Sequence, residues 1–108
     1  MPVVRLHHDT QRLDVDVDWD ALASDLATVL KTTLNAEDRT LQIMLVPMRI
    51  TFGKPIYVEM QARSNEARPA QVIQKAMAEV EGAVDRHTRC QPRIRYFAVD
   101  QDLLFALG

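Results

Sequence analysis

Apolar and polar positions alternate along the chain in a strand–helix–strand order. Residues 3–8 (VVRLHH) are rich in β-branched side chains and predict a strand. Residues 19–34 repeat apolar side chains at three- and four-residue steps, which predicts a helix with one apolar stripe. Asp18 suits the N-cap of this helix, and Asn35 suits its end. A strand and a helix therefore open the chain.

The second strand and the third differ in their pattern. Residues 41–48 (LQIMLVPM) are apolar at both alternating sets of positions, which predicts a strand buried on both sides. Residues 51–55 (TFGKP) carry the glycine and proline of a turn. Residues 56–63 (IYVEMQAR) alternate regularly, which predicts a strand with one buried face.

The remaining segments repeat the order of the first half. Pro69 suits the first position of a second helix. The apolar stripe of this helix comprises Ile73, Ala76, Met77, Val80 and Val84. Residues 93–99 (RIRYFAV) predict the fourth strand, and the apolar tail 100–108 suggests a short fifth one.

This order predicts one α+β (α/β-like) domain, 1–108, built from duplicated βαβ units in the pseudo-repeats 1–50 and 51–108. Parallel strands need a crossover helix, and such units are right-handed. The simplest assembly is a four-stranded mixed sheet with two helices on one face. Its other face would carry Arg5, His7, Tyr57, Glu59, Gln61, Arg63, Arg93 and Arg95. Together with the apolar tail, this mixed face favours subunit association over exposure to solvent.

Composition excludes several classes of protein. Apolar residues make up 47% of the chain and charged residues 26%, as in soluble globular domains. The net charge of -2 gives no basic excess for nucleic acid. No apolar run has the length of a membrane span, and the start lacks the apolar core of a signal peptide. The single cysteine, Cys90, excludes an internal disulfide and fits a reducing cytoplasm.

The second residue is the first candidate for chemistry. Pro2 follows the initiator Met1 and becomes a secondary amine if that methionine is removed. His7 and His8 are adjacent in a strand and therefore point to opposite faces, so they do not form a metal pair. No spacing indicates a zinc site, a P-loop or a dinucleotide fingerprint, and no cofactor or metal is expected.

Taken together, these features resemble the tautomerase superfamily. Met1-Pro2 leads directly into the first strand, and the chain is a doubled βαβ unit. The stretch 57–71 (YVEMQARSNEARPAQ) resembles the strand, loop and helix-start arginine of 5-carboxymethyl-2-hydroxymuconate isomerase. Macrophage migration inhibitory factor shares this layout. The resemblance spans nearly the whole chain.

The resemblance implies an isomerase or tautomerase that assembles into an oligomer. It implies a homotrimer whose three sheets form a barrel with the helices outside, and an active site at each subunit boundary. Pro2 would be the general base and acid for a small 2-oxo or dienol carboxylate. Arg68, at a helix start, would orient the carboxylate. Arg12 would face a site across the subunit boundary.

Two departures from the family keep other interpretations open. Ala36 and Gln42 stand where relatives have cationic residues. If Met1 stays attached, the nitrogen of Pro2 is an amide without a basic lone pair. The alternatives are a non-catalytic trimeric module that binds a small ligand or serves assembly, and a ferredoxin-like βαββαβ domain. The sequence does not separate tautomerase, decarboxylase and dehalogenase variants, nor does it identify the physiological substrate.

Overall fold

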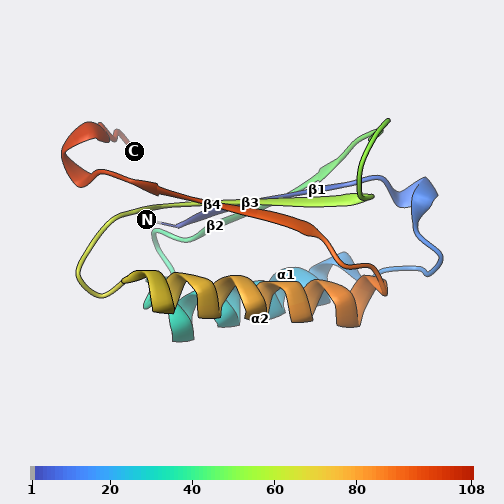
Figure 1. Cartoon of the computed structure of the whole chain (residues 1–108), viewed down its shortest axis with the longest axis horizontal. Coiled ribbons are helices and arrows are strands. Elements are labelled where there is room, and N and C mark those ends of the chain that lie inside the picture. Colours follow the sequence, from blue (N-terminus) through green and yellow to red (C-terminus); the bar gives the residue numbers. More distant parts are fainter. Residues whose placement is uncertain (1) are drawn as a thin grey trace.

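The computed structural model describes residues 2–108. Within this range a four-stranded sheet lies over a layer of two α-helices (Figure 1). The elements run in the order β1 (Val3–His8), α1 (Trp19–Thr33), β2 (Gln42–Pro47), β3 (Ile56–Arg63), α2 (Ala70–Thr88) and β4 (Arg93–Val99). Short 3-10 turns occupy η1 (Thr10–Arg12) and η2 (Gln101–Leu103). No helix within residues 2–108 is long and apolar enough to cross a membrane.

The sheet joins two βαβ halves through its centre. The strand order is β2-β1-β3-β4, with β1 parallel to β2, β3 parallel to β4, and β1 antiparallel to β3. Each parallel pair is adjacent, with no strand inserted between its members. The predicted mixed sheet with both helices on one face is confirmed. The ferredoxin-like alternative is wrong because that topology splits its βαβ pairs.

Alternating burial along β1 and β3 separates the two faces of the sheet. Every second side chain of β3, from Ile56 to Ala62, is buried against the helices, while the intervening ones are partly exposed. The core comprises these residues with Val4 and Leu6 of β1, Leu22, Leu26 and Leu30 of α1, and Ala76, Val80, Ala83 and Val84 of α2. The opposite side, the open face, carries the mixed polar set expected from sequence.

Three expectations are corrected. Strand β2 is only partly buried, because it is an edge strand and the open face has no layer above it in a single chain. The tail forms η2 and an irregular segment instead of a fifth strand, since the carboxylate of Asp100 accepts a hydrogen bond from the Asp102 amide at 2.9 Å. Pro69 is the N-cap of α2 and not its first helical residue.

The loop between β2 and β3, residues 48–55, rises from the sheet at the end opposite both termini (Figure 1). The guanidinium of Arg12 donates to the carbonyls of Ile50 at 3.1 Å and Gly53 at 2.9 Å. The carboxylate of Asp9 accepts from the Ile50 amide at 3.0 Å. Gly53 has a φ of 94°, which favours glycine. These contacts hold the loop in a defined shape.

At the same end of the sheet, His8 is buried against the first helix. Its ring stacks on Trp19 with centroids 3.9 Å apart, and its Nδ1 lies 3.0 Å from the hydroxyl of Thr10. Burial lowers the pKa of His8, and the nearby Asp9 carboxylate offsets part of that effect. The unfolded chain therefore takes up a proton at this position more readily than the folded chain.

This shift predicts a pH-dependent stability. The folded state keeps the full contribution of neutral His8 above the unfolded pKa of 6.5 and loses it as the pH falls through that value. We expect His8→Gln to reduce the fall in Tm between about pH 7.5 and about pH 5.5. Thermal unfolding followed by circular dichroism at both pH values measures this difference, with His7→Gln as the matched control. A fall as steep as that of the unaltered chain would contradict it.

Candidate active site

A hollow of about 600 Å³ lies at the edge of the sheet where β2 begins and β3 ends. Three parts of the chain meet there: the segment that enters β2, the end of β3 and the C-terminal tail. The lining residues are Arg39, Thr40, Leu41, Gln42, Arg63, Ala106 and Gly108. Both chain ends lie at this side of the molecule in Figure 1.

Pro2 is in contact with one of the residues that line this hollow. It is buried, and its carbonyl accepts a hydrogen bond from the Gln42 amide at 3.1 Å. Val3 lies opposite Gln61 in the antiparallel register of β1 and β3, so Pro2, one step further back, falls opposite Ala62, the residue before Arg63. Met1 lies outside the described residues, and so does the expectation about its removal. The backbone of Pro2 is therefore joined to Gln42, one of the residues that line the hollow.

Arg63 is a charged residue in the lining of the hollow. Its Nε is buried and has no hydrogen-bond acceptor among residues 2–108. A buried donor without a partner costs about 1–3 kcal/mol, and more when the group is charged. Because Arg63 lines the hollow, its guanidinium brings a positive charge there.

Arg39 adds a second positive charge to the same wall. Its Nε donates to the carboxylate of Glu37 at 2.9 Å, and both side chains are largely exposed. Sequence reasoning missed both arginines, since it treated Arg39 as a surface charge and Arg63 as part of the open face. Their signal is positional: Arg39 precedes β2 and Arg63 ends β3, and parallel and antiparallel pairing bring both positions to the start of β1.

Arg68 is placed differently from the sequence-based expectation. It is 9% exposed, and its Nε and Nη1 donate to the carbonyls of Leu34 at 3.1 Å and Arg63 at 3.2 Å. Leu34 caps the C-terminal end of α1, where the helix dipole attracts a cation. Arg68 does not line the hollow. It donates a hydrogen bond to the backbone carbonyl of Arg63, and Arg63 does line the hollow. Burial raises the pKa of Tyr96, and the positive charge of Arg68 offsets part of that rise.

These contacts predict that Arg68 contributes to stability. Arg68→Met leaves two buried or partly buried carbonyls without a charged donor, and we expect a loss of about 2–4 kcal/mol in the free energy of unfolding. Urea unfolding measures it. Arg86→Met, on the exposed side of α2, is the matched control and is expected to change little. Equal midpoints for the two variants would contradict the structural role of Arg68.

Arg12 lies at the other end of the molecule from Pro2. The six residues of β1 separate them by roughly 20 Å within one chain. Both amino groups of the Arg12 guanidinium contact the β2–β3 loop. A single chain therefore does not bring Arg12 to the hollow beside Pro2.

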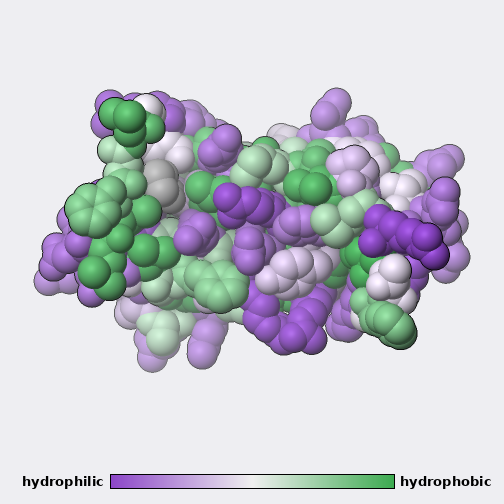
Figure 2. Space-filling model, turned by 90° about the horizontal axis from the view of Figure 1, so that it is seen from above, coloured by the Kyte–Doolittle hydropathy of each residue, from purple (hydrophilic) through white to green (hydrophobic). Residues whose placement is uncertain are grey.

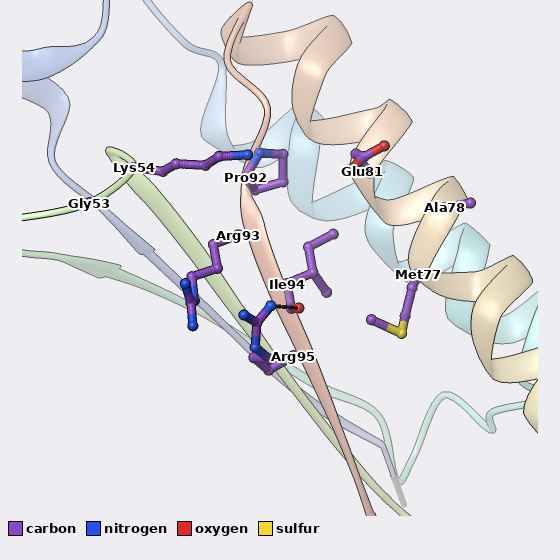
Figure 3. A pocket seen from close by; sticks show the side chains of 9 residues that line it. All are labelled: Gly53, Lys54, Met77, Ala78, Glu81, Pro92, Arg93, Ile94 and Arg95. Carbon is purple, nitrogen blue, oxygen red and sulfur yellow. Dashed lines mark hydrogen bonds between the residues drawn. The ribbon is translucent and has the colours of Figure 1, made fainter.

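A second hollow, of about 580 Å³, lies between β4 and α2. Figure 3 shows that its residues do not converge: Arg93 and Arg95 lie on the side of β4 away from α2, whereas Ile94 and Met77 face each other between strand and helix. One amino group of Arg95 is bonded to the carbonyl of Ile94 at 2.8 Å. Neither Pro2 nor Gln42, its hydrogen-bond partner, lines this hollow, so it is a weaker candidate for chemistry at Pro2.

No metal centre is evident in the part of the chain that the structure describes. No group of three or more His, Cys, Asp or Glu side chains there is arranged to hold a metal ion. His8 and His7 point to opposite faces, as the strand pattern predicts: His8 stacks on Trp19, and His7 stacks on Tyr57 across the open face.

Comparison with known proteins bears on the fold. No protein-family model matches the sequence, and the search of curated proteins gave no significant match. Solved structures do match over nearly the whole chain. A macrophage migration inhibitory factor-like protein from Entamoeba histolytica has 7% identity and a TM-score of 0.73, with 97% of this chain and 94% of that chain covered.

Two further structures extend this likeness. A member of the cis-3-chloroacrylic acid dehalogenase family has 13% identity and a TM-score of 0.74, covering 98% of this chain and 80% of that one. A fused wild-type 4-OT symmetric trimer has 12% identity and a TM-score of 0.72, covering 96% and 90%. The chain therefore has the fold of the tautomerase superfamily. At these identities the likeness is one of fold, and it confirms the resemblance seen in the sequence at that level.

Proposed function

We propose that the protein is a tautomerase or isomerase that moves a proton on a small 2-oxo or dienol carboxylate, with the amine of Pro2 as general base and acid. The observation that carries this proposal is the position of Pro2: it immediately precedes β1 and its carbonyl is hydrogen-bonded to Gln42, which lines the same hollow as Arg63. Processing of Met1 would turn that position into a secondary amine at the edge of an anion site.

The proposed reaction needs no other reagent. The free amine of Pro2 takes a proton from the carbon beside the substrate carbonyl, the C–H electron pair forms a C=C bond, and the carbonyl π pair moves to oxygen to give an enolate or dienolate. The resulting ammonium then returns the proton to another atom of the same substrate. A base works best when its pKa is near the working pH. In a chain that begins at Pro2, its buried position would favour the neutral amine, which is the form that accepts the proton.

Arginines would hold the substrate during this transfer. A guanidinium can grip a carboxylate with two parallel hydrogen bonds. Arg63 brings its positive charge to the lining of the hollow, and Arg39 offers the amino groups that Glu37 leaves free. Arg68 retains a role in this proposal as a positioning residue, because it fixes the carbonyl of Arg63.

The proposal includes a homotrimer. The 4-OT structures with the same fold are trimers. In such an assembly Arg12, which is distant from Pro2 within its own chain, would face the hollow of a neighbouring subunit. The partly buried β2 and the open face would be covered by other subunits.

Turnover by the processed protein tests the proposal. Protein that begins at Pro2 is expected to tautomerise phenylpyruvate or 2-hydroxymuconate, and protein that keeps Met1 is expected to be inactive, because its Pro2 nitrogen is an amide. Equal rates for the two forms would contradict a catalytic amine. No turnover by either form, together with binding of the substrate, would favour the alternative of a non-catalytic trimeric module.

A further inference from the structure

The two halves of the chain repeat each other at a fixed spacing. Asn35 and Arg89, whose numbers differ by 54, each lie at the C-terminal end of a helix and share a φ of 56°. The buried faces of the two helices follow the same spacing, as Leu22 of α1 and Ala76 of α2 show. At this spacing the position of Pro2, directly before β1, corresponds to Ile56 at the start of β3.

A separate hollow of about 570 Å³ lies on the open face, at the end of the sheet where β3 begins. Residues of β1, β3, β4 and the β2–β3 loop line it. Figure 2 looks down on the open face and shows a hydrophobic group beside strongly hydrophilic side chains at the right end, where this loop lies in Figure 1. Arg93 lines this hollow as Arg39 lines the one near Pro2, and their numbers also differ by 54.

Two stacked rings form an aromatic surface in this hollow. His7 and Tyr57 lie opposite each other in the register of β1 and β3, and their ring centroids are 5.6 Å apart with an angle of 27° between the planes. Burial raises the pKa of Tyr57, and the Glu59 carboxylate adds to this rise, so the ring stays uncharged. Met48 and Phe52 of the loop add apolar side chains to the lining. This surface suits a planar aromatic ring.

The uncompensated charge of the hollow is positive. Lys54 and Arg93 line it, and none of the ion pairs among residues 2–108 involves either side chain. Arg93 lies on the side of β4 away from α2, which is the side of the open face (Figure 3). The acid in the lining is Glu59, and its carboxylate is paired with Arg5 at 3.7 Å and accepts from the Tyr57 hydroxyl at 3.4 Å. The two free cations therefore favour an anion.

The loop that carries Lys54 is held in place before any ligand binds. The guanidinium of Arg12 donates to the carbonyls of Ile50 and Gly53, the residue directly before Lys54. The Asp9 carboxylate accepts from the Ile50 amide. A ligand that meets a preformed loop does not have to order it, and this lowers the free-energy cost of binding.

We propose that this hollow is a second binding site, which holds a small aromatic carboxylate without turning it over. The ring of the ligand stacks on His7 and Tyr57, and its carboxylate pairs with Arg93 and Lys54. Ile56 occupies the position that corresponds to Pro2, and it is fully buried with a peptide nitrogen inside the chain. The site therefore has no counterpart of the Pro2 amine, and ligand binding there does not depend on the proposed catalysis.

Phenylacetate is the probe, because it has an aromatic ring and a carboxylate but no ketone to tautomerise. Titration of the full chain, followed by ¹H–¹⁵N spectra, is expected to shift the amides of residues 52–54 and 57 to saturation. Phenylacetamide, which lacks the charge, is expected to bind there at least about 10-fold more weakly. Equal binding of the two compounds, or shifts confined to the surroundings of Gln42, would overturn the proposal.

Paired variants locate the contact. Lys54→Met with Arg93→Met is expected to raise the Kd for phenylacetate, read from residues 52–54, by at least about 10-fold. Arg49→Met with Arg86→Met removes the same charge from exposed residues outside the hollow, and it is expected to change this Kd by less than about 3-fold. Equal Kd values for the two double variants would reject the site.

The two proposals fail separately. Saturable binding at residues 52–54 in a protein that turns over no substrate would reject the proposed catalysis alone. Turnover by protein that begins at Pro2, without saturable shifts at residues 52–54, would reject the second site alone. Arg63→Met, in the lining of the hollow near Pro2, is expected to leave the Kd read from residues 52–54 unchanged.

Discussion

Replacing Pro2 by alanine in protein that begins at residue 2 is expected to lower kcat/KM for phenylpyruvate tautomerisation by about 10²- to 10⁴-fold, the usual contribution of a general base or acid. The alanine variant keeps a primary amine, but it lacks the ring that fixes the direction of the nitrogen lone pair. Steady-state kinetics measures the effect, with both proteins shown by intact mass to begin at residue 2.

A second proline provides the control. Pro47 is exposed at the end of β2, away from the hollow, and Pro47→Ala is expected to keep the kcat/KM of the unaltered protein. The two variants must be compared at equal Tm and equal oligomeric mass. Equal rates for Pro2→Ala and the unaltered protein would remove the proposed mechanism and leave the fold unaffected.

Arg63→Met is expected to give the second largest effect, a loss of about 10- to 100-fold in kcat/KM that resides mainly in KM. This range corresponds to the hydrogen bonds of one charged group, about 1.5–3 kcal/mol. Arg63→Lys keeps the charge but not the planar fork, and it is expected to recover only part of the loss. Kinetics of both variants with a carboxylate substrate measures the difference, and Arg95→Met, on β4, is the matched control.

The pH profile separates a binding role of Arg63 from a structural one. A neighbouring cation lowers the pKa of the Pro2 amine, so its removal is expected to shift the acidic limb of the kcat/KM profile to higher pH. A loss of stability alone would not move that limb. An unchanged limb and an unchanged KM in Arg63→Met would contradict the assignment of Arg63 to the site.

The strand pattern predicted more of the fold than of the site. Strict alternation in residues 56–63 predicted both the buried face of β3 and the polar face that stays open, because burial on one side imposes a period of two. The same reasoning failed for β2, whose apolar side chains on both faces are only partly buried in a single chain. Its pattern is that of a strand whose second face is covered by other subunits, which a sequence cannot distinguish from one covered by its own chain.

The roles of the site residues depend on which way their side chains point, and the sequence does not show this. Arg68 is next to a helix start, and its position alone suggested an anion grip. In the structure the guanidinium of Arg68 donates to the carbonyls of Leu34 and Arg63. Leu34 is 34 residues away in the sequence, so the sequence around Arg68 does not indicate this contact. Arg63 ends an amphipathic strand, and nothing in its sequence neighbours indicates that its Nε is buried without an acceptor.

The intact mass of the protein isolated from its own cells tests the central claim most directly. The account predicts a chain that starts at Pro2, with the mass of the sequence less one methionine, because only then does the hollow beside Arg63 border a basic ring nitrogen. A mass that includes Met1 in the whole native population would leave that nitrogen as an amide and contradict the catalytic proposal.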